Sequence, residues 1–327
     1  MFILSLTTTD PFFNLAADEY LLKNSREEYL ILGINNPSVI IGKHQTPHRE
    51  TNTSYITRNN IPVIRRISGG GTVFHDHGNL NFSFILNSTS GKQVDFRKYT
   101  QPVIKFLATT GVEAKFEGKN DLKVNGLKIS GNAEHVWRNR VLHHGTLLFD
   151  SHLDILKKSL REDNSCYFSR AVASNPSPVA NLKDYLVSVR NINELKFKML
   201  DYFLNQDKNP EVNLSKDEST KINELADSRY RTWEWNYAYG PAYQFKKHLE
   251  IRGNSIEFML SVKNGIIQEC TIEGSDLFAR FAGKLIGCRH MPEDILSAFK
   301  TEVLLNDDEL FDFFWILVRF YGIGLNY

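Results

Sequence analysis

The most informative stretch of the chain is RRISGGGTVFHDHGN, from Arg65 to Asn79. A β-type run leads into three consecutive glycines, and the chain then returns as a strand. Glycines lack a Cβ and adopt positive φ, so their N–H groups can converge on one point as an anion-binding nest. Arg65 and Arg66 add fixed charges whose planar donors suit phosphate or carboxylate. A plain hairpin turn between surface arginines explains the same stretch, and Gly69 to Gly71 match neither the Walker nor the dinucleotide-binding spacing.

Strands are expected on both sides of this stretch, in runs rich in β-branched and aromatic residues. They are 29–34, 38–43, 62–68 and 79–86. Asn35, Asn36 and Pro37 predict a hairpin between the first two strands. From Val112 to Phe149, alternation of apolar and polar residues predicts an antiparallel meander with turns at Asn125-Gly126 and at 138–140.

Helices are expected where capping residues precede apolar residues at helical spacing. Asp10 and Pro11 begin the first helix, and Asp95 and Gly111 bound a second at 96–110. Ser215 and Glu218 form a capping box for a helix that extends to 229. The other predicted helices are 152–161, 192–205, 278–285, 293–299 and 308–320.

These elements predict an α/β (α+β) fold with mixed, largely antiparallel sheets and flanking helices. Tyr239-Gly240-Pro241 interrupts the chain after WEWNY, residues 233–237, and marks a domain boundary. We therefore expect a larger domain at 1–240 and a small α+β domain at 241–327, whose strands turn at Asn264-Gly265.

A second chemically informative segment surrounds Lys128. The lysine lies between an Asn-Gly turn and Ser130-Gly131-Asn132-Ala133, small residues that allow a ligand to approach the backbone. A lysine ammonium can hold a phosphate and a carbonyl oxygen together while charge moves between them. A solvated hairpin lysine is the simpler alternative. His143-His144 precedes an expected strand, where a histidine pair is as compatible with a structural role as with a catalytic one.

Composition excludes several classes of protein. The 327 residues are 42% hydrophobic and 24% charged, as in a globular protein. With 39 Lys and Arg against 38 Asp and Glu, no bulk charge favours nucleic acid or an acidic membrane. Three cysteines are too few for a disulfide scaffold, and the N-terminus has no basic region before its apolar run. No apolar stretch approaches the roughly 20 residues of a membrane span, so we expect a soluble cytoplasmic protein.

The sequence also argues against two kinds of active site. The cysteines and histidines match no zinc spacing, so we predict no metal site of the protein's own. There is no G-x-S-x-G elbow, and the cysteines lack a histidine neighbourhood, which disfavours covalent catalysis. A site of backbone donors with Arg and Lys remains, suited to a phosphoanhydride or an acyl phosphate.

Seven motifs together resemble the lipoate-protein ligase A family. They occur in the family's order and spacing from about residue 10 to about residue 245, and they are FFNLAADEYLL, PSVIIGKHQTPHRETN, RRISGGGTVFHDHGNLNFSF, GKNDL, LKISGNA, HHGTLLFD and WEWNY. The family is related to biotin ligases and class II aminoacyl-tRNA synthetases, and most members carry a small C-terminal accessory domain. The resemblance implies activation of lipoate with ATP, with Mg²⁺, to lipoyl-AMP. The lipoyl group then passes to a lysine of a lipoyl-domain acceptor.

The resemblance also assigns residues and partners. Lys128 is the catalytic lysine, which touches the α-phosphate and the lipoyl carboxyl oxygen. The other nucleotide-binding positions are Arg66, Gly71, Thr72, Val73 and Phe74, and the lipoate-binding positions are Lys128, Gly70, His75 and His144. Asn120 and Asp121 are the next candidates, placed to hold the nucleotide or to orient Lys128. Phe82, Phe84 and Leu147 are possible walls of an apolar slot for lipoate. The implied acceptors are acyltransferase subunits of 2-oxoacid dehydrogenases and the glycine cleavage H protein, with no nucleic acid or membrane partner, and we expect a monomer.

Two segments depart from the family pattern. Gly33-Ile34 lacks a Trp-Arg pair common at that point. In ASNPSPVANL (173–182), Pro176 and Pro178 stand where many ligases carry arginines that close over the adenylate. This run is more similar to animal lipoyltransferases that use a preformed nucleotide ester. A lipoyl- or octanoyltransferase that uses a preformed acyl-adenylate is therefore an alternative, as is a silent carrier of lipoyl-AMP. Arg170 could take the place of the missing arginines.

Overall fold

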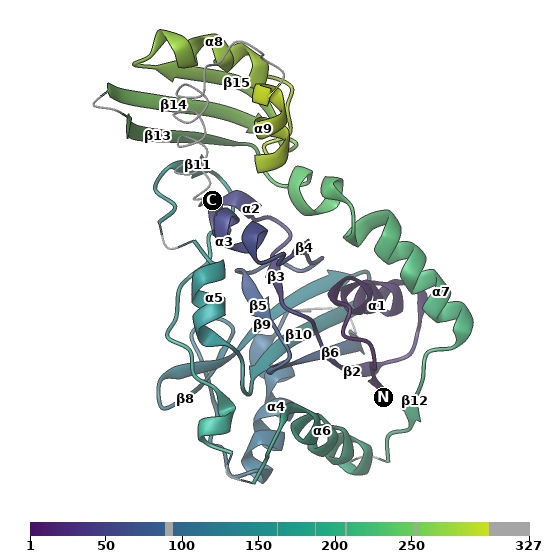
Figure 1. Cartoon of the computed structure of the whole chain (residues 1–327). Helices are drawn as coiled ribbons and strands as arrows, with labels where there is room; N and C mark the ends of the chain where they lie inside the picture. Colours follow the sequence, from purple (N-terminus) through teal and green to yellow (C-terminus); the bar gives the residue numbers. More distant parts are fainter. Residues whose placement is uncertain (89–93, 162, 187, 207, 252–253, 301–327) are drawn as a thin grey trace. The chain divides into compact units, whose positions relative to one another are not determined.

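The computed structural model describes residues 1–88, 94–161, 163–186, 188–206, 208–251 and 254–300. The helix expected at 308–320 lies outside these residues. The chain folds into two compact units, whose elements are labelled in Figure 1. The first unit comprises Met1–Lys43, Val63–Leu156 and Ser174–Thr232, and the second comprises His44–Pro62, Lys157–Ala173 and the chain from Trp233 onward. Among the residues in the described ranges, none of the helices combines the length and the apolar character that a membrane span requires.

An eight-stranded mixed sheet is the centre of the first unit. Its strand order is β12-β1-β2-β6-β10-β9-β8-β7. In chain order, these strands are β1 (Phe2–Ser5), β2 (Tyr29–Ile34), β6 (Asn79–Asn87), β7 (Lys115–Glu117), β8 (Asp121–Val124), β9 (Leu127–Trp137), β10 (Arg140–Leu148) and β12 (Glu211–Val212). β1 runs parallel to β2 and β12, and the other pairs are antiparallel. The mixed, largely antiparallel fold and the predicted meander, β7 to β10, are both confirmed.

Helices cover the two faces of this sheet. The helices of the unit are α1 (Pro11–Asn24), α4 (Phe96–Thr109), α6 (Ile192–Gln206) and α7 (Lys216–Leu225), with a 3-10 turn at Leu182–Asp184 and a π turn at Ala226–Tyr230. α1 contacts β6 and β10, where Asp18 receives a hydrogen bond from Ser83. Because side chains alternate along a strand, Phe82 and Phe84 point to the opposite face. There they join the core with Phe106 of α4 and Phe203 of α6.

The predicted helix caps are confirmed. The Asp10 side chain accepts a hydrogen bond from Phe12 N, and Asp95 accepts one from Lys98 N. Ser215 and Glu218 form both hydrogen bonds of a capping box. α7 ends at Leu225, four residues before the expected end at 229, and the chain continues as the π turn.

The hairpin expected between 29–34 and 38–43 is wrong. β2 lies between β1 and β6 in the large sheet, whereas β3 (Ser38–Ile41) lies in a separate three-stranded sheet, β4-β3-β5. Almost every residue of both strands is buried. Such strands need pairing strands along both edges and packed side chains on both faces. A two-stranded hairpin does not provide either. The Asn35 side chain holds the connection, since it accepts from Asn14 Nδ2 at 2.7 Å.

The second unit contains a four-stranded antiparallel sheet in the order β11-β13-β14-β15. Its strands are β11 (Tyr167–Ser169), β13 (Tyr243–Ile251), β14 (Asn254–Lys263) and β15 (Ile266–Glu273), and its helices are α2 (Pro47–Glu50), α3 (Thr53–Arg58), α8 (Asp276–Leu285) and α9 (Pro292–Lys300), with a π turn at Glu234–Ala238. α5 (Leu153–Ser159) carries the chain from the first unit to the second. Asn264 and Gly265 both have positive φ, which confirms the predicted turn.

Candidate functional site

The glycine run connects two strands that flank β3. β4 (Val63–Arg65) pairs with β3 in parallel, and β5 (Val73–His75) pairs with it in antiparallel fashion. Gly70 has φ of +86°, a conformation that favours glycine. An added Cβ at Gly42 would lie 2.1 Å from the Gly70 carbonyl oxygen, so the turn packs closely on the end of β3. The run is therefore an ordered turn that crosses from one edge of a small sheet to the other, and not a hairpin.

Arg66 organises this turn from inside. Its guanidinium donates from Nη2 to the carbonyls of Gly69 (2.6 Å) and Gly71 (2.7 Å), and from Nη1 to the carbonyl of Ile40 (3.1 Å). Burial lowers the pKa of Arg66 to about 10, so the side chain still carries its charge at neutral pH. The structure thus places a buried positive charge directly beneath the glycines, where it would favour a bound anion.

Lys128 lies on β9, next to the residues expected to work with it. Its Nζ is 2.7 Å from Oδ1 of Asp121 on β8. An added Cβ at Gly131 would lie 3.2 Å from that Nζ and 3.8 Å from Cγ1 of Val73. The ammonium therefore lies over a glycine of its own strand, between Asp121 and the start of β5. Lys128, Asp121 and Val73 are brought together as the sequence led us to expect.

The proline-bearing loop lies against both parts of this site. Thr72 N donates to Ser174 Oγ at 2.9 Å, so the loop contacts the glycine turn. Further along, Lys128 N donates to the Pro178 carbonyl at 2.8 Å, and Ala180 N donates to the Lys128 carbonyl at 2.9 Å. These two hydrogen bonds form an isolated parallel β-bridge between Lys128 and Val179. The loop thus contacts both the glycine turn and the backbone of Lys128, and so connects the two parts of the site.

His144 belongs to a chain of polar contacts that begins on α1. Its Nδ1 is 3.2 Å from Oδ2 of Asp18, and its Nε2 is 2.6 Å from Oγ of Ser68. The arrangement has the order of a Ser-His-Asp triad. However, Ser68 is fully buried and its Oγ also accepts a hydrogen bond from Arg66 Nε at 2.9 Å. Ser68 is therefore a hydrogen-bond link between His144 and the glycine turn rather than an exposed nucleophile.

Several other predicted residues are buried in the interior of the first unit. His75 is buried, its Nδ1 is 2.9 Å from Nδ2 of Asn35, and burial together with the charges of Arg66 and His144 lowers its pKa to about 3. The Phe74 side chain is 2% exposed and belongs to the interior. Phe82, Phe84 and Leu147, the expected walls of a lipoate slot, are buried in the core on the sheet face opposite His144.

Three residues of the site were not anticipated, namely Asp18, Ser68 and Ser174. Asp18 could have been found from the pattern of its helix. It follows Asn14 by four residues and precedes Glu19, and all three are buried polar side chains among the apolar residues of the helix, which points to specific partners. Ser174 has no comparable signal, because its contact with Thr72 spans 102 residues of sequence.

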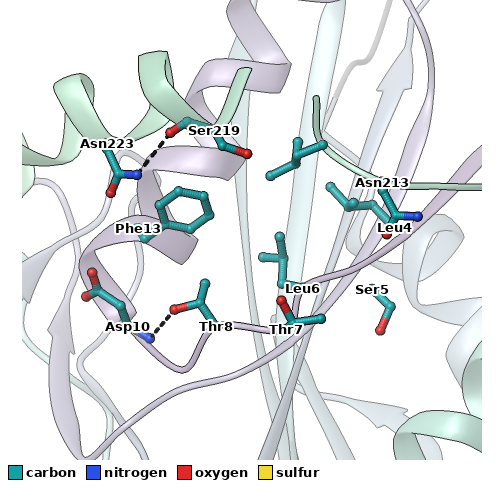
Figure 2. Close-up of a pocket in the computed structure, with 11 residues that line it drawn as sticks. Leu4, Ser5, Leu6, Thr7, Thr8, Asp10, Phe13, Asn213, Ser219 and Asn223 are labelled. Atoms are coloured by element: carbon teal, nitrogen blue, oxygen red, sulfur yellow. Dashed lines mark hydrogen bonds between the residues drawn. The ribbon is translucent and has the colours of Figure 1, made fainter. Parts of the chain in front are cut away.

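A cavity of about 340 Å³ lies elsewhere in the first unit (Figure 2). Its walls are the end of β1, the β1–α1 connection, the start of α1, the segment between β12 and α7, and α7 itself. The lining residues are Leu4, Ser5, Leu6, Thr7, Thr8, Asp10, Phe13, Asn213, Leu214, Ser219 and Asn223. None of the predicted site residues lines this cavity, so we place the functional site at the glycine turn on chemical grounds.

Comparisons with known proteins identify the family. The family model described as the lipoyl protein ligase A/B catalytic domain matches residues 10–204, and that of the bacterial lipoate protein ligase C-terminus matches residues 240–308. Lipoate-protein ligase 1 of Staphylococcus aureus is 37% identical over 320 residues, which cover 96% of this chain and 95% of that protein. Lipoate-protein ligase LplJ of Bacillus subtilis is 38% identical over 279 residues, 84% of each chain. The chain belongs to the lipoate-protein ligase family.

Solved structures agree with this assignment. The P. falciparum LipL1 structure in complex with lipoate superposes with a TM-score of 0.63 at 25% identity, over 97% of this chain and 99% of that one. A lipoate-protein ligase A bound with ATP gives a TM-score of 0.62 at 28% identity, over 72% of this chain and 97% of that one. A bipartite ligase from Thermoplasma acidophilum, described together with its E2 lipoyl domain, gives 0.63 at 28% identity, over 72% and 95%.

Proposed function

We propose that this chain activates lipoate with ATP and transfers the lipoyl group to a lysine of a lipoyl-domain acceptor. In the first step, a lipoate carboxylate oxygen attacks the α-phosphorus, and pyrophosphate leaves with the bonding electron pair. In the second step, the lysine amine attacks the lipoyl carbonyl carbon, AMP leaves, and an amide forms with loss of a proton. Relatives that are named as ligases, and similar structures described with lipoate, with ATP or with an E2 lipoyl domain, support both steps.

The position of Lys128 is the observation that carries the proposal. Adenylation brings a carboxylate onto a phosphate that is already negative, so the transition state needs positive charge at that point. Nζ of Lys128 is held by Asp121 at 2.7 Å, beside the strand that leaves the glycine turn. An ammonium that is fixed in advance needs little reorganisation when the charge develops, which favours the transition state over the bound substrates.

The acceptors that we propose are acyltransferase subunits of 2-oxoacid dehydrogenases and the glycine cleavage H protein. We also propose that 1–240 form the catalytic domain and 241–327 the accessory domain, which the second family match supports. The three cysteines are free, as is usual in a reducing compartment, and this supports action in the cytoplasm. We propose a monomer, because Lys128, Asp121 and Arg66, the charged groups placed at this site, all come from one chain.

Mg²⁺ would enter this site together with ATP. Mg²⁺ binds oxygen ligands and is usually held by substrate phosphates with one or two carboxylates. The Asp121 carboxylate, beside Lys128 and partly accessible, has the right donor chemistry. When bound, the ion offsets phosphate charge, while Lys128 and Arg66 supply the fixed charges of the protein.

The loop at 173–182 favours a second candidate, a transferase that uses preformed acyl-adenylate. Pro176 and Pro178 occupy the segment that contacts both Thr72 and Lys128, where a clamp on the nucleotide would be expected to carry arginine. A loop without these charges would hold ATP less firmly, yet it would leave acyl transfer intact.

Mass spectrometry of an acceptor domain tests the proposal. The domain is incubated with the protein, lipoate and Mg-ATP, and in parallel with the protein and synthetic lipoyl-AMP. We expect a lipoylated domain in both reactions. Modification only with lipoyl-AMP would support the transferase, and modification in neither would contradict both candidates.

A further inference from the structure

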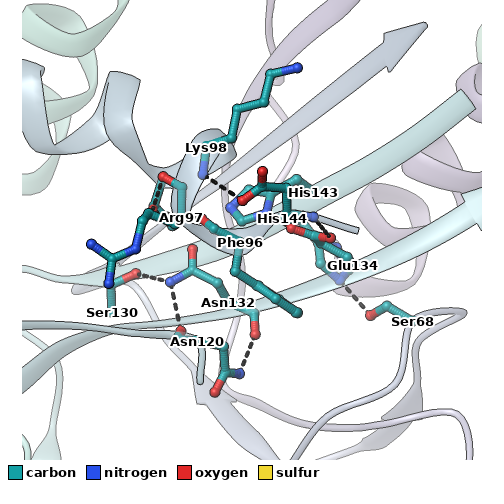
Figure 3. A network of polar contacts seen from close by, with 12 residues as sticks. Ser68, Phe96, Arg97, Lys98, Asn120, Ser130, Asn132, Glu134, His143 and His144 are labelled. Atoms are coloured by element: carbon teal, nitrogen blue, oxygen red, sulfur yellow. Dashed lines mark hydrogen bonds and ion pairs between the residues drawn. The ribbon is translucent and has the colours of Figure 1, made fainter. Parts of the chain in front are cut away.

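Two asparagines join the strands that carry Lys128 and Asp121 (Figure 3). Asn120 immediately precedes Asp121. Asn132 lies on β9, opposite Asn120. Nδ2 of Asn120 donates to the carbonyl of Asn132 at 2.5 Å. In return, both the backbone N and the side-chain Nδ2 of Asn132 donate to the carbonyl of Asn120, each at 3.0 Å. Three hydrogen bonds therefore connect these residues at the base of the β8–β9 hairpin.

The Asn132 side chain is locked in one orientation. It is 3% exposed, and its Nδ2 also donates to Ser130 Oγ at 3.2 Å. Because a backbone carbonyl only accepts, the amide nitrogen must face Asn120. On the other side, an added Cβ at Gly145 would lie 2.3 Å from Oδ1 of Asn132. The side chain fits in this orientation only because the neighbouring strand carries a glycine there.

Asp121 pairs with Glu117 of β7 and with Gly131 of β9, but the β8–β9 ladder is irregular close to it. β8 and β9 change register between Leu122 and Lys123, one residue after Asp121. Such an irregularity loosens the ladder at that point and re-aims nearby side chains. The asparagine pair lies on the other side of Asp121, at the position before it. It therefore adds side-chain hydrogen bonds to the strand pairing, next to the carboxylate that holds Lys128.

We propose that Asn132 is a positioning residue for adenylation. It fixes Asn120, which sets the backbone of Asp121, and the Asp121 carboxylate then holds Nζ of Lys128 at 2.7 Å. This inference rests on the proposed function. Loss of the Asn132 amide would leave the charges of the site unchanged but would let the ammonium move from its place. A misplacement of about 1 Å can lower a rate by about a hundredfold.

The test measures lipoate-dependent pyrophosphate release in Asn132→Ala, Asp121→Ala and the double variant. We expect kcat to fall about tenfold to hundredfold in Asn132→Ala, with KM for the acceptor domain unchanged. If Asn132 acts through Asp121, the double variant will be no slower than the slower single variant, because coupled residues are not additive. Ser130→Ala is the matched control, since it removes the other partner of the same amide nitrogen, and its kcat should stay within about twofold of wild type.

Asn132→Ser guards against a variant that fails to fold, because it removes the same donor and leaves a smaller cavity. We expect a similar loss of kcat and a melting temperature close to that of Ser130→Ala. Wild-type kcat in both Asn132 variants, or additive losses in the double variant, would overturn the inference while the proposed function stands. Wild-type protein that neither releases pyrophosphate nor transfers from lipoyl-AMP would overturn the proposed function, and the inference with it.

Discussion

At the scale of single residues, we propose that Lys128 carries the chemistry, although it contributes little to the stability of the fold. Its side chain is 21% exposed and its ion pair with Asp121 is partly solvated, so the pair stabilises the fold by about 0–1 kcal/mol. We predict that Lys128→Ala lowers the single-turnover rate of lipoyl-AMP formation about 10²- to 10³-fold, as for the loss of one preorganised donor. Its melting temperature should stay within about 3 °C of wild type.

Lys123→Ala is the matched control for this substitution. Lys123 lies directly across the hairpin from Lys128 and pairs with Glu117 at 3.4 Å. Adenylate formation at the wild-type rate is expected in this variant. An equal loss in both variants would assign the effect to the charge of the hairpin rather than to Lys128.

Gly70 tests whether the shape of the glycine turn matters. It has φ of +86°, and an added Cβ would lie 3.0 Å from Nη2 of Arg66. We predict that Gly70→Val weakens ATP binding at least about tenfold, because a left-handed β-branched residue costs about 1–2 kcal/mol and displaces the guanidinium. Isothermal titration with ATP measures this. Gly69→Ala, where a Cβ meets nothing within 4 Å, should bind ATP more tightly than Gly70→Val, and the reverse order would contradict this role of the turn.

Local sequence signals identified part of this site and long-range contacts supplied the rest. Lys128 was a candidate because a lysine among small residues is visible in one short segment, and the family resemblance added Asp121. Asp18 and Ser174 were missed because their partners, His144 and Thr72, are 126 and 102 residues away. No pattern within one strand or loop reports such contacts.

At the scale of elements, turns and caps were predictable, and strand partners were not. The turn at Asn125-Gly126 has positive φ at both residues, because few residue pairs other than Asn-Gly adopt that turn. By contrast, we predicted a hairpin of β2 and β3, but the two strands lie in different sheets, because each is almost completely buried and needs neighbours on both sides. β12 was missed altogether, since Glu211 and Val212 lie in a polar segment and form a strand only by pairing with β1.

We propose that the loop at 173–182 decides whether the chain activates lipoate by itself. Arg170, just upstream, is exposed and is our substitute for the arginines that Pro176 and Pro178 replace. We predict that Arg170→Ala lowers lipoate-dependent pyrophosphate release about tenfold to hundredfold, since one charged contact contributes about 1.5–3 kcal/mol. Transfer from supplied lipoyl-AMP should fall much less. Pyrophosphate release that is unaffected by the substitution would remove Arg170 from the clamp.

At the scale of the whole molecule, buried histidines set the response to acid. Burial lowers the pKa of His75 in the first unit and of His48 in the second unit to about 3, aided by Arg66 and Arg161 respectively. In the unfolded chain their pKa is about 6.5, so below that pH only the unfolded state takes up their protons. Stability is therefore complete above pH 6.5 and is lost as the pH falls toward 3.

As the pH falls from 6.5 to 5, each buried histidine should lower the free energy of unfolding by about 2 kcal/mol. We predict that calorimetric melting temperatures decline steadily over this range. Replacing His48 or His75 by Gln should flatten the decline, whatever it does to stability at neutral pH. Melting temperatures that stay constant down to pH 5 would contradict the assignment of both histidines as buried and neutral.

The most direct measurement of the central claim is lipoate-dependent exchange of radiolabelled pyrophosphate into ATP by the wild-type protein, without any acceptor. Exchange reports the adenylation step alone, because it requires formation and reversal of lipoyl-AMP at the site. We predict exchange that depends on lipoate and is lost in Lys128→Ala. Wild-type protein that shows no exchange, yet transfers lipoyl from synthetic lipoyl-AMP to an acceptor domain, would contradict the claim that this site activates lipoate.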